Sequence, residues 1–251
     1  MSGYTQYIQT MNSTNRIKAV FFDLDGTLRH SVPEGGAVFT EYVASLGLQV
    51  SHEDRVRSMR WEYNYWASSP DLRDDLLAHS PDTDNFWIEY SRRRLIALGV
   101  SPEHAIDLAP QASAHMGEMY KPESIVPDDV RRMLPQLQQA GYLMAVISNR
   151  DRPFLDILIS HGLSEFFPYS LAAGEVDTYK PEPGIFKHAL KQMNVAAHET
   201  VYVGDNYYAD AVGARRAGLE PVLYDPNFIF PDADCPTIHS FDQLLSVIQA
   251  L

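Results

Sequence analysis

The hydrophobic and polar positions divide the chain into three stretches. A polar segment, Met1 to Asn15, precedes a β-branched and aromatic run at residues 18–23 that predicts the first strand. From about residue 33 to residue 120, apolar positions recur every three or four residues, which predicts helices. Breaks at Pro70, Pro81 and Pro102 divide this stretch into four or five helices.

After residue 121 the pattern alternates between strands and helices. Strands are predicted at 142–147, 169–171, 200–203 and 221–224, and helices at 127–139, 153–160, 184–193 and 209–217. The strand at 142–147 is apolar on both faces, as buried parallel strands are. Repeated βα units with short links favour a parallel sheet with helices on both faces. We therefore predict an α/β fold, a doubly wound, Rossmann-like parallel sheet with an inserted helical domain.

These boundaries predict a discontinuous domain organisation. We expect an α/β core formed by residues 16–29 and 122–251, a helical insert at residues 30–121, and a flexible tail at residues 1–15.

Charge and composition narrow the classes of partner. Twenty basic residues against 33 acidic ones give a formal net charge of −13, which disfavours nucleic acid and anionic membranes. No apolar run approaches the roughly 20 residues that cross a bilayer. The single cysteine, Cys235, cannot form an internal disulfide. We expect a cytoplasmic protein, either a monomer or a homodimer, that acts on a small molecule.

Polar residues follow four of the predicted elements, where a doubly wound sheet binds its ligands. They are Asp23-Leu24-Asp25-Gly26-Thr27, Ser148-Asn149, Lys180-Pro181, and Gly204-Asp205 with Asp210. Each alone has an ordinary explanation as a turn, a helix cap or a surface residue. Two like charges 4 Å apart repel by about 4 kcal/mol at an effective dielectric near 20, so carboxylates clustered in one crevice require a cation. Magnesium suits such a site, and tetrahedral phosphate suits the donors beside it.

These four segments, in this order, resemble the four motifs of the haloacid dehalogenase superfamily of hydrolases. The resemblance covers nearly all of the chain outside the helical insert, and the insert occupies the position of that superfamily's helical C1-type cap. Within the superfamily, the chain resembles the uncharacterised haloacid dehalogenase-like hydrolases.

The resemblance implies a role for each motif residue. Asp23 would be the nucleophile that forms an aspartyl-phosphate. Asp25 would protonate the leaving oxygen and later deprotonate the attacking water, which requires its pKa to lie above that of Asp23. Magnesium would be held by the Asp23 carboxylate, the Asp25 carbonyl and Asp205, with Asp210 as a further ligand or a support. Ser148, Asn149 and Lys180 would hold the phosphoryl oxygens, and Thr27 would orient the loop.

Several other functions share part of this set of motifs. Dehalogenation and phosphonate cleavage are disfavoured because those branches lack the second acid, present here as Asp25. A phosphomutase shares the first motif and stays open. A signalling receiver domain is smaller and lacks the insert. A catalytically silent binding protein would leave clustered carboxylates without a ligand, at a cost in stability. Dinucleotide binding has no glycine-rich fingerprint to support it.

Substrate selection in capped members of the superfamily usually lies in the cap and the loop after the first motif. Candidates here are Arg29, His30, Trp61 and Tyr65. Trp61 and Tyr65 are also one helical turn apart, which is typical of a small helical core. The sequence therefore predicts a magnesium-dependent phosphatase that hydrolyses a small phosphorylated metabolite.

Overall fold

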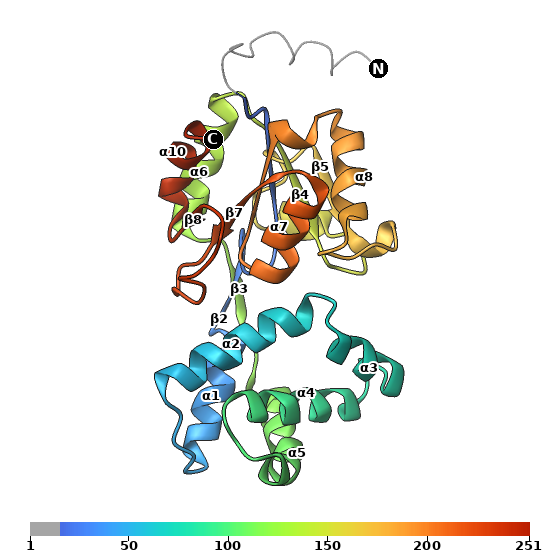
Figure 1. Cartoon of the computed structure of the whole chain (residues 1–251), viewed down its shortest axis with the longest axis vertical. Helices are drawn as coiled ribbons and strands as arrows, with labels where there is room; N and C mark the ends of the chain where they lie inside the picture. Colours follow the sequence, from blue (N-terminus) through green and yellow to red (C-terminus); the bar gives the residue numbers. More distant parts are fainter. Residues whose placement is uncertain (1–15) are drawn as a thin grey trace. The chain divides into compact units, whose positions relative to one another are not determined.

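The computed structural model describes residues 16–251, which form two compact units (Figure 1). One unit combines residues 16–29 with Val126–Leu251, and the other is His30–Ile125. The domain boundaries predicted from the sequence differ from these units only at residues 122–125, where a short strand groups with the helices. The predicted tail, residues 1–15, lies outside the described residues.

The first unit is built on a six-stranded sheet in the order β5-β4-β1-β6-β7-β8, in which every neighbouring pair is parallel. The predicted fold class is confirmed. The strands are β1 (Ala19–Phe22), β4 (Leu143–Ser148), β5 (Tyr169–Ala172), β6 (Thr200–Gly204), β7 (Glu220–Tyr224) and β8 (Thr237–Ile238).

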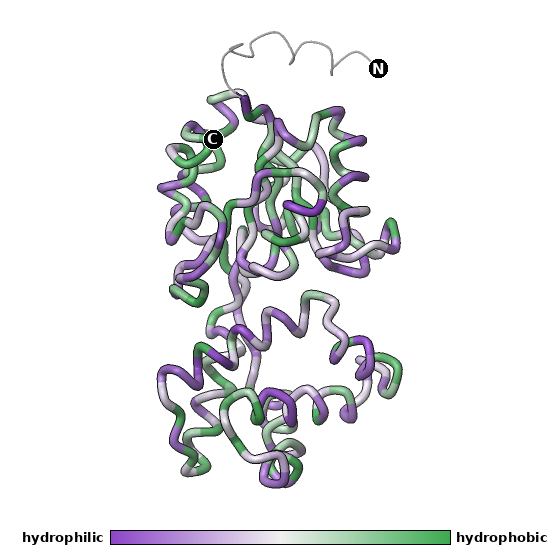
Figure 2. The backbone as a smooth tube through the Cα atoms, in the orientation of Figure 1, coloured by the Kyte–Doolittle hydropathy of each residue, from purple (hydrophilic) through white to green (hydrophobic). Residues whose placement is uncertain are grey.

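Helices cover both faces of this sheet. They are α6 (Asp128–Gln139), α7 (Leu155–Ser160), α8 (Pro183–Met193), α9 (Val212–Ala217) and α10 (Leu244–Gln249), with short 3-10 turns η1 (Ala173–Glu175), η2 (Ala197–Glu199) and η4 (Phe241–Gln243). Because side chains alternate along a strand, Val20 and Phe22 pack with α6, α7 and α10. Ala19 and Phe21 pack with α8 and α9 on the opposite face. The turns of α8 alternate between hydrophobic and hydrophilic positions (Figure 2), as expected of a helix with one buried face.

The helix predicted at 209–217 begins differently from the prediction. It starts with a π-helical turn, η3 (Tyr207–Ala211), before α9. The Asn206 side chain accepts hydrogen bonds from the amides of Tyr208 and Ala209, at 3.0 and 3.1 Å, and so caps this turn. β8 and α10 were not predicted from the sequence.

The second unit is helical. It contains α1 (Gly35–Ser45), α2 (His52–Trp66), α3 (Pro70–Ala78), α4 (Asp84–Ala97) and α5 (Pro102–Met119), bounded by the antiparallel strands β2 (His30–Val32) and β3 (Glu123–Ile125). Five helices agree with the four or five predicted. Ser69 and Ser101 cap α3 and α5, and a proline occupies the first turn of each. Phe39, Val43 and Leu95 belong to its core.

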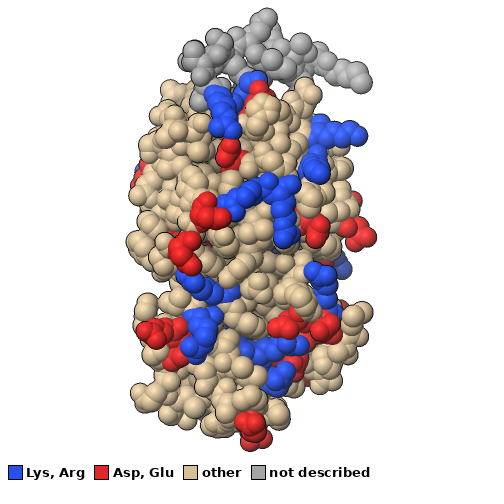
Figure 3. All heavy atoms as spheres, in the orientation of Figure 1, with Lys and Arg blue, Asp and Glu red and all other residues tan. Residues whose placement is uncertain are grey.

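Acidic and basic side chains are interspersed on the face that Figure 3 shows, so neither sign forms a continuous field there. Across residues 16–251, no helix combines the length and the apolar character that a bilayer crossing needs.

Candidate active site

The polar strand ends predicted from the sequence lie at one edge of the sheet. β1 is flanked by β4 and β6, and Asp23, Ser148 and Asp205 stand at or directly after the carboxyl ends of these three strands. Successive strands are added on one side of β1 in the order β4, β5 and on the other side in the order β6, β7, β8. Doubly wound sheets bind their ligands at the carboxyl ends of the strands where the order reverses in this way.

Lys180 is the centre of this edge. Its side chain is only 3% exposed, and its Nζ donates hydrogen bonds to Asp23 Oδ1 and Asp210 Oδ1, both at 2.6 Å, and to the Tyr202 hydroxyl at 3.0 Å. Tyr202 in turn donates to the carbonyl of Ile147 at 2.8 Å. Burial lowers the pKa of Lys180, but the carboxylates of Asp210 and Asp23 outweigh it, so the net pKa is raised and the ammonium stays charged.

Asn149 positions Lys180 through its side chain. The Asn149 Oδ1 accepts from the Lys180 backbone amide at 2.6 Å, and Nδ2 donates to the Lys180 carbonyl at 2.9 Å. Both polar atoms of this side chain are therefore engaged with the Lys180 backbone. Ser148, predicted as a phosphate ligand, is buried at the end of β4 beside it.

Three carboxylates surround the lysine on the other side. Asp23, Asp205 and Asp210 each offer an oxygen within 4.8 Å of the other two. Thr27 anchors Asp205 twice, because its hydroxyl donates to Asp205 Oδ1 at 3.1 Å and accepts from the Asp205 amide at 3.0 Å. Asp210 Oδ2 accepts from the amide of Asn206 at 2.9 Å. One lysine cannot neutralise three carboxylates, and an all-oxygen donor set of this kind fits a hard divalent cation.

The excess of carboxylates over cations shifts the pKa values of Asp23 and Asp205. Burial raises the pKa of Asp23 to about 7, although the ammonium of Lys180 acts in the opposite direction. Burial also raises the pKa of Asp205, and the charges of Asp23 and Asp210 add to this effect. Each shift reports carboxylates that have lost water without gaining enough positive charge.

Asp25 lies in a different environment from Asp23. Its carboxylate accepts from Arg29 Nε at 2.6 Å and from Arg150 Nε and Nη2 at 2.8 and 3.1 Å. Burial acts to raise its pKa, but the hydrogen bonds and charges of Arg150 and Arg29 outweigh it, so the pKa is lowered. In the metal-free site the pKa of Asp25 lies below that of Asp23, the reverse of the order expected for the reacting enzyme, because the two arginines stabilise the Asp25 carboxylate.

Two glycines allow the acidic groups to approach the backbone. Gly26 has a φ of +87°, and a Cβ added there would lie 2.2 Å from Asp205 Oδ2. A Cβ at Gly204 would lie 2.3 Å from Asp210 Cγ. Close packing therefore requires glycine at both positions, and at Gly26 the backbone conformation requires it as well.

The substrate-selecting candidates occupy different places. Arg29 contacts Asp25, His30 begins β2, and Trp61 and Tyr65 lie on α2 of the helical unit. Tyr65 is buried and donates to Asp75 Oδ2 at 2.9 Å, and the ring centroids of Trp61 and Tyr65 lie 5.1 Å apart. The two aromatic residues on α2 therefore contribute to packing within the helical unit.

Tyr202 and Arg150 are site residues that the sequence analysis missed. Tyr202 lies within an apolar strand, where it has the pattern of a core residue. Arg150 directly follows Ser148-Asn149, and that adjacency was the only available signal.

The sheet, the helical unit inserted after its first strand and the acidic strand ends define a class, the doubly wound α/β enzymes with an inserted helical domain. The sequence profile of the haloacid dehalogenase-like hydrolases matches residues 17–218, and the chain belongs to this family. The resemblance noted from the motifs is confirmed.

The chain is similar to named phosphatases over most of its length. It is 27% identical to the phosphoglycolate phosphatase of Vibrio cholerae, over 80% of this chain and 81% of the relative. It is 31% identical to the ribulose-1,5-bisphosphate 5-phosphatase of Halopiger xanaduensis, over 83% of this chain and 85% of the relative. The crystal structure of a 2-haloacid dehalogenase from Pseudomonas syringae pv. Tomato DC3000 is 26% identical, with a TM-score of 0.53, and the match covers 92% of this chain and 98% of that one. The protein is a phosphoric monoester hydrolase of the haloacid dehalogenase type.

Proposed function

We propose that the protein is a magnesium-dependent phosphatase that hydrolyses a small phosphorylated metabolite through an aspartyl-phosphate on Asp23. The observation that carries this proposal is the buried Asp23 carboxylate, oriented by Lys180 at 2.6 Å and grouped with Asp205 and Asp210. A carboxylate held in one orientation at a strand end is suited to in-line attack on phosphorus.

Asp23 and Asp205, with the backbone carbonyl of Asp25, would hold the magnesium ion. Both oxygens of Asp210 already accept hydrogen bonds, from Lys180 and from the Asn206 amide, which supports a role in holding the lysine. A bound divalent cation would neutralise charge between the nucleophile and the phosphate.

The remaining steps are performed by side chains of this chain. An oxygen of Asp23 forms a bond to phosphorus while the bond to the ester oxygen breaks, and that oxygen takes a proton from Asp25. For Asp25 to carry this proton, the bound anionic substrate must offset the two guanidinium groups that lower the pKa of Asp25 in the free protein. A water then attacks phosphorus and gives its proton to Asp25, the bond to Asp23 breaks, and inorganic phosphate leaves. Lys180, Ser148 and the Asn149 backbone amide hold the phosphoryl oxygens, and Thr27 keeps Asp205 in place.

The test compares the wild type with Asp23→Asn on a panel of phosphate esters, with and without magnesium. Asp128→Asn, which removes an exposed carboxyl from α6 of the same unit, is the matched control. We expect magnesium-dependent release of phosphate by the wild type and the control, and none by Asp23→Asn. Borohydride reduction during turnover should convert residue 23 to homoserine, detected by mass spectrometry. Equal release by Asp23→Asn and the wild type would refute the nucleophile assignment.

Product identity separates hydrolysis from the phosphomutase alternative. A hydrolase releases one inorganic phosphate for each ester consumed. Formation of an isomeric phosphate ester without free phosphate would replace the proposal with a mutase.

A further inference from the structure

We infer that Arg150, with Arg29 beside it, selects phosphate esters whose leaving group carries a second negative charge. This inference rests on the proposed function, because it places the leaving group next to Asp25, the residue that would protonate it. The substrate class that follows is a phosphorylated carboxylate or a bisphosphate, in preference to a phosphate ester of a neutral alcohol.

The first observation is the convergence of two guanidinium groups on one carboxylate. Asp25 is shared by Arg29 and Arg150, and its side chain is 43% exposed. Asp25 engages Nε and Nη2 of Arg150, while Nη1 has no hydrogen-bond partner among residues 16–251. A planar guanidinium with a donor still available is suited to a carboxylate or a phosphate of the substrate.

The second observation is that the loop carrying Arg150 is fixed by its neighbours. The Gly174 amide donates to the Arg150 carbonyl at 3.1 Å, and a Cβ on Gly174 would lie 2.0 Å from the Asp151 carbonyl oxygen. The hydroxyl of Tyr179 donates to Asp151 Oδ1 at 2.7 Å. The backbone under Arg150 is therefore ordered before a ligand binds, which lowers the entropic cost of binding.

Arg29 is held in a similar way. Its amide donates to the Leu24 carbonyl at 3.0 Å, and its carbonyl accepts from the Gly26 amide at 2.8 Å. The loop that positions the nucleophile Asp23 thus also positions Arg29. Both cations have fixed backbones on the same unit as the nucleophile.

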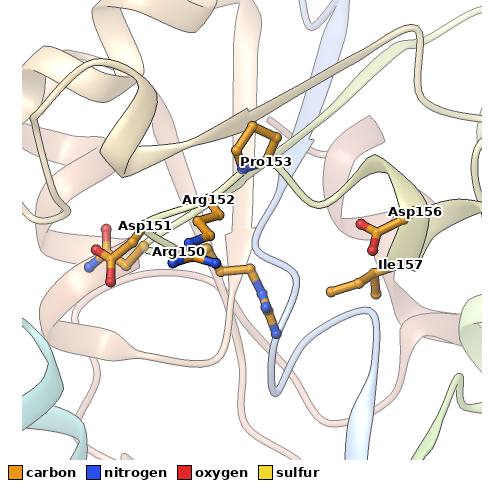
Figure 4. Close-up of a pocket in the computed structure, with 7 residues that line it drawn as sticks. Arg150, Asp151, Arg152, Pro153, Asp156 and Ile157 are labelled. Carbon is orange, nitrogen blue, oxygen red and sulfur yellow. The ribbon is translucent and has the colours of Figure 1, made fainter. Parts of the chain in front are cut away.

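The third observation is a cleft of about 510 Å3 beside Arg150. It is lined by Asn149, Arg150, Asp151, Arg152, Pro153, Asp156 and Ile157. The loop residues lie together, and Asp156 and Ile157 lie across from them on α7 (Figure 4). The lining carries two cations, Arg150 and Arg152, and two carboxylates, Asp151 and Asp156, and the Asp151 carboxylate accepts a hydrogen bond from the hydroxyl of Tyr179. The cleft thus offers space for a small polar leaving group, with Arg150 on its wall.

The test uses three phosphate esters of equal chain length: ethyl phosphate, 2-phosphoglycolate and phosphoethanolamine, whose leaving groups are neutral, anionic and cationic. For the wild type with magnesium we expect kcat/KM to be highest for 2-phosphoglycolate, by about 10- to 100-fold over ethyl phosphate, which is the size of a charge-assisted hydrogen bond. Phosphoethanolamine should be the poorest of the three.

Arg150→Gln should collapse the ratio of kcat/KM between 2-phosphoglycolate and ethyl phosphate. Arg216→Gln removes the same charge from an exposed position on α9 of the same unit, outside the cleft, and should preserve the ratio. Equal ratios in the wild type and Arg150→Gln, or a wild type without preference, would overturn the inference, while continued phosphate release would leave the proposed function intact.

A binding measurement decides the inference independently of turnover. Calorimetric titration of Asp23→Asn with 2-phosphoglycolate and with ethyl phosphate should show tighter binding of the former, and Arg150→Gln in that background should remove the difference. Equal affinities of the two esters for Asp23→Asn would overturn the inference. Failure of the wild type to hydrolyse any ester would refute the proposed function instead, and the binding measurement would still decide the inference.

Discussion

Gly26→Ala tests the geometry of the site with a single methyl group. Gly26 follows Asp25 in the first motif and has a φ of +87°, so any other L-residue is strained there. The added Cβ would lie 2.2 Å from Oδ2 and 2.7 Å from Cγ of Asp205, the carboxylate that we propose as a magnesium ligand. The substitution therefore displaces Asp205 without changing any charged or polar group.

The structure gives the size of the loss in stability and of the loss in catalytic rate. The left-handed backbone conformation costs about 1–2 kcal/mol for a residue with a Cβ. For Asp205 to move from 2.2 Å to the 3.4 Å of ordinary contact, its carboxylate must retreat by about 1.2 Å. This movement strains the 3.1 Å hydrogen bond from Thr27. A displacement of about 1 Å in a catalytic arrangement costs about 100-fold in rate.

Gly141→Ala is the matched control, because Gly141 has a φ of +85° with no atom within 4 Å of the added Cβ. It follows α6 in the same unit. The backbone conformation should cost each variant about 1–2 kcal/mol, which corresponds to roughly 2–8 °C in Tm by calorimetry, and the contact with Asp205 should add to this loss in Gly26→Ala. Only Gly26→Ala should lose about 100-fold in kcat/KM and need more magnesium for half-maximal activity. Equal kcat/KM and equal magnesium requirements in the two variants would refute the proposed placement of Asp205.

Three further predictions concern buried polar groups. Lys180→Met leaves the carboxylates of Asp23 and Asp210 without their cation, and should lower the free energy of unfolding of the metal-free protein by about 3–5 kcal/mol in urea titrations; an unchanged midpoint would contradict the central position of the lysine. Because burial raises the pKa of Asp23 from 3.8 to about 7, its contribution to stability is complete below pH 4 and disappears as the pH rises through 7. Metal-free protein should therefore have a lower Tm at pH 8 than at pH 5, and Asp23→Asn should reduce this difference. In the helical unit, Tyr65→Phe removes the hydroxyl that donates to the buried Asp75, and should lower the free energy of unfolding by about 1–3 kcal/mol in the same titrations. A stability equal to that of the wild type would show that Asp75 does not need this donor.

The sequence was sufficient to predict the sheet because its central strands are long apolar runs between clear turn signals. β4 and β6 are buried along almost their whole length, so their hydrophobicity alone marks them. β8 contains only Thr237–Ile238, which is too short to show a periodic pattern. The π-helical turn at Tyr207–Ala211 was also not predictable, because it depends on the capping side chain of Asn206 as well as on hydrophobic spacing.

The candidate site also contains residues that the sequence predicts and contacts that it does not. Residues at strand ends, such as Asp23 and Asp205, could be found because the topology brings such ends to one edge. The pairing of Asp25 with Arg150 joins positions 125 residues apart, and no local pattern encodes it. The order of the two carboxyl pKa values in the metal-free site depends on that pairing, so the sequence alone could not predict it.

The two ends of the first motif differ in how the fold compensates charge. Asp23 is buried with one lysine shared among three carboxylates, and its pKa rises because the lost hydration is not replaced. Asp25, two residues further, is partly exposed and receives two guanidinium groups, and its pKa falls. Because positive charge is lacking around Asp23, the phosphate side of the site requires a cation. Because positive charge is concentrated around Asp25, the leaving-group side favours an anion. The metal and substrate preferences that we propose are therefore consequences of one uneven distribution of charge along the loop that follows β1.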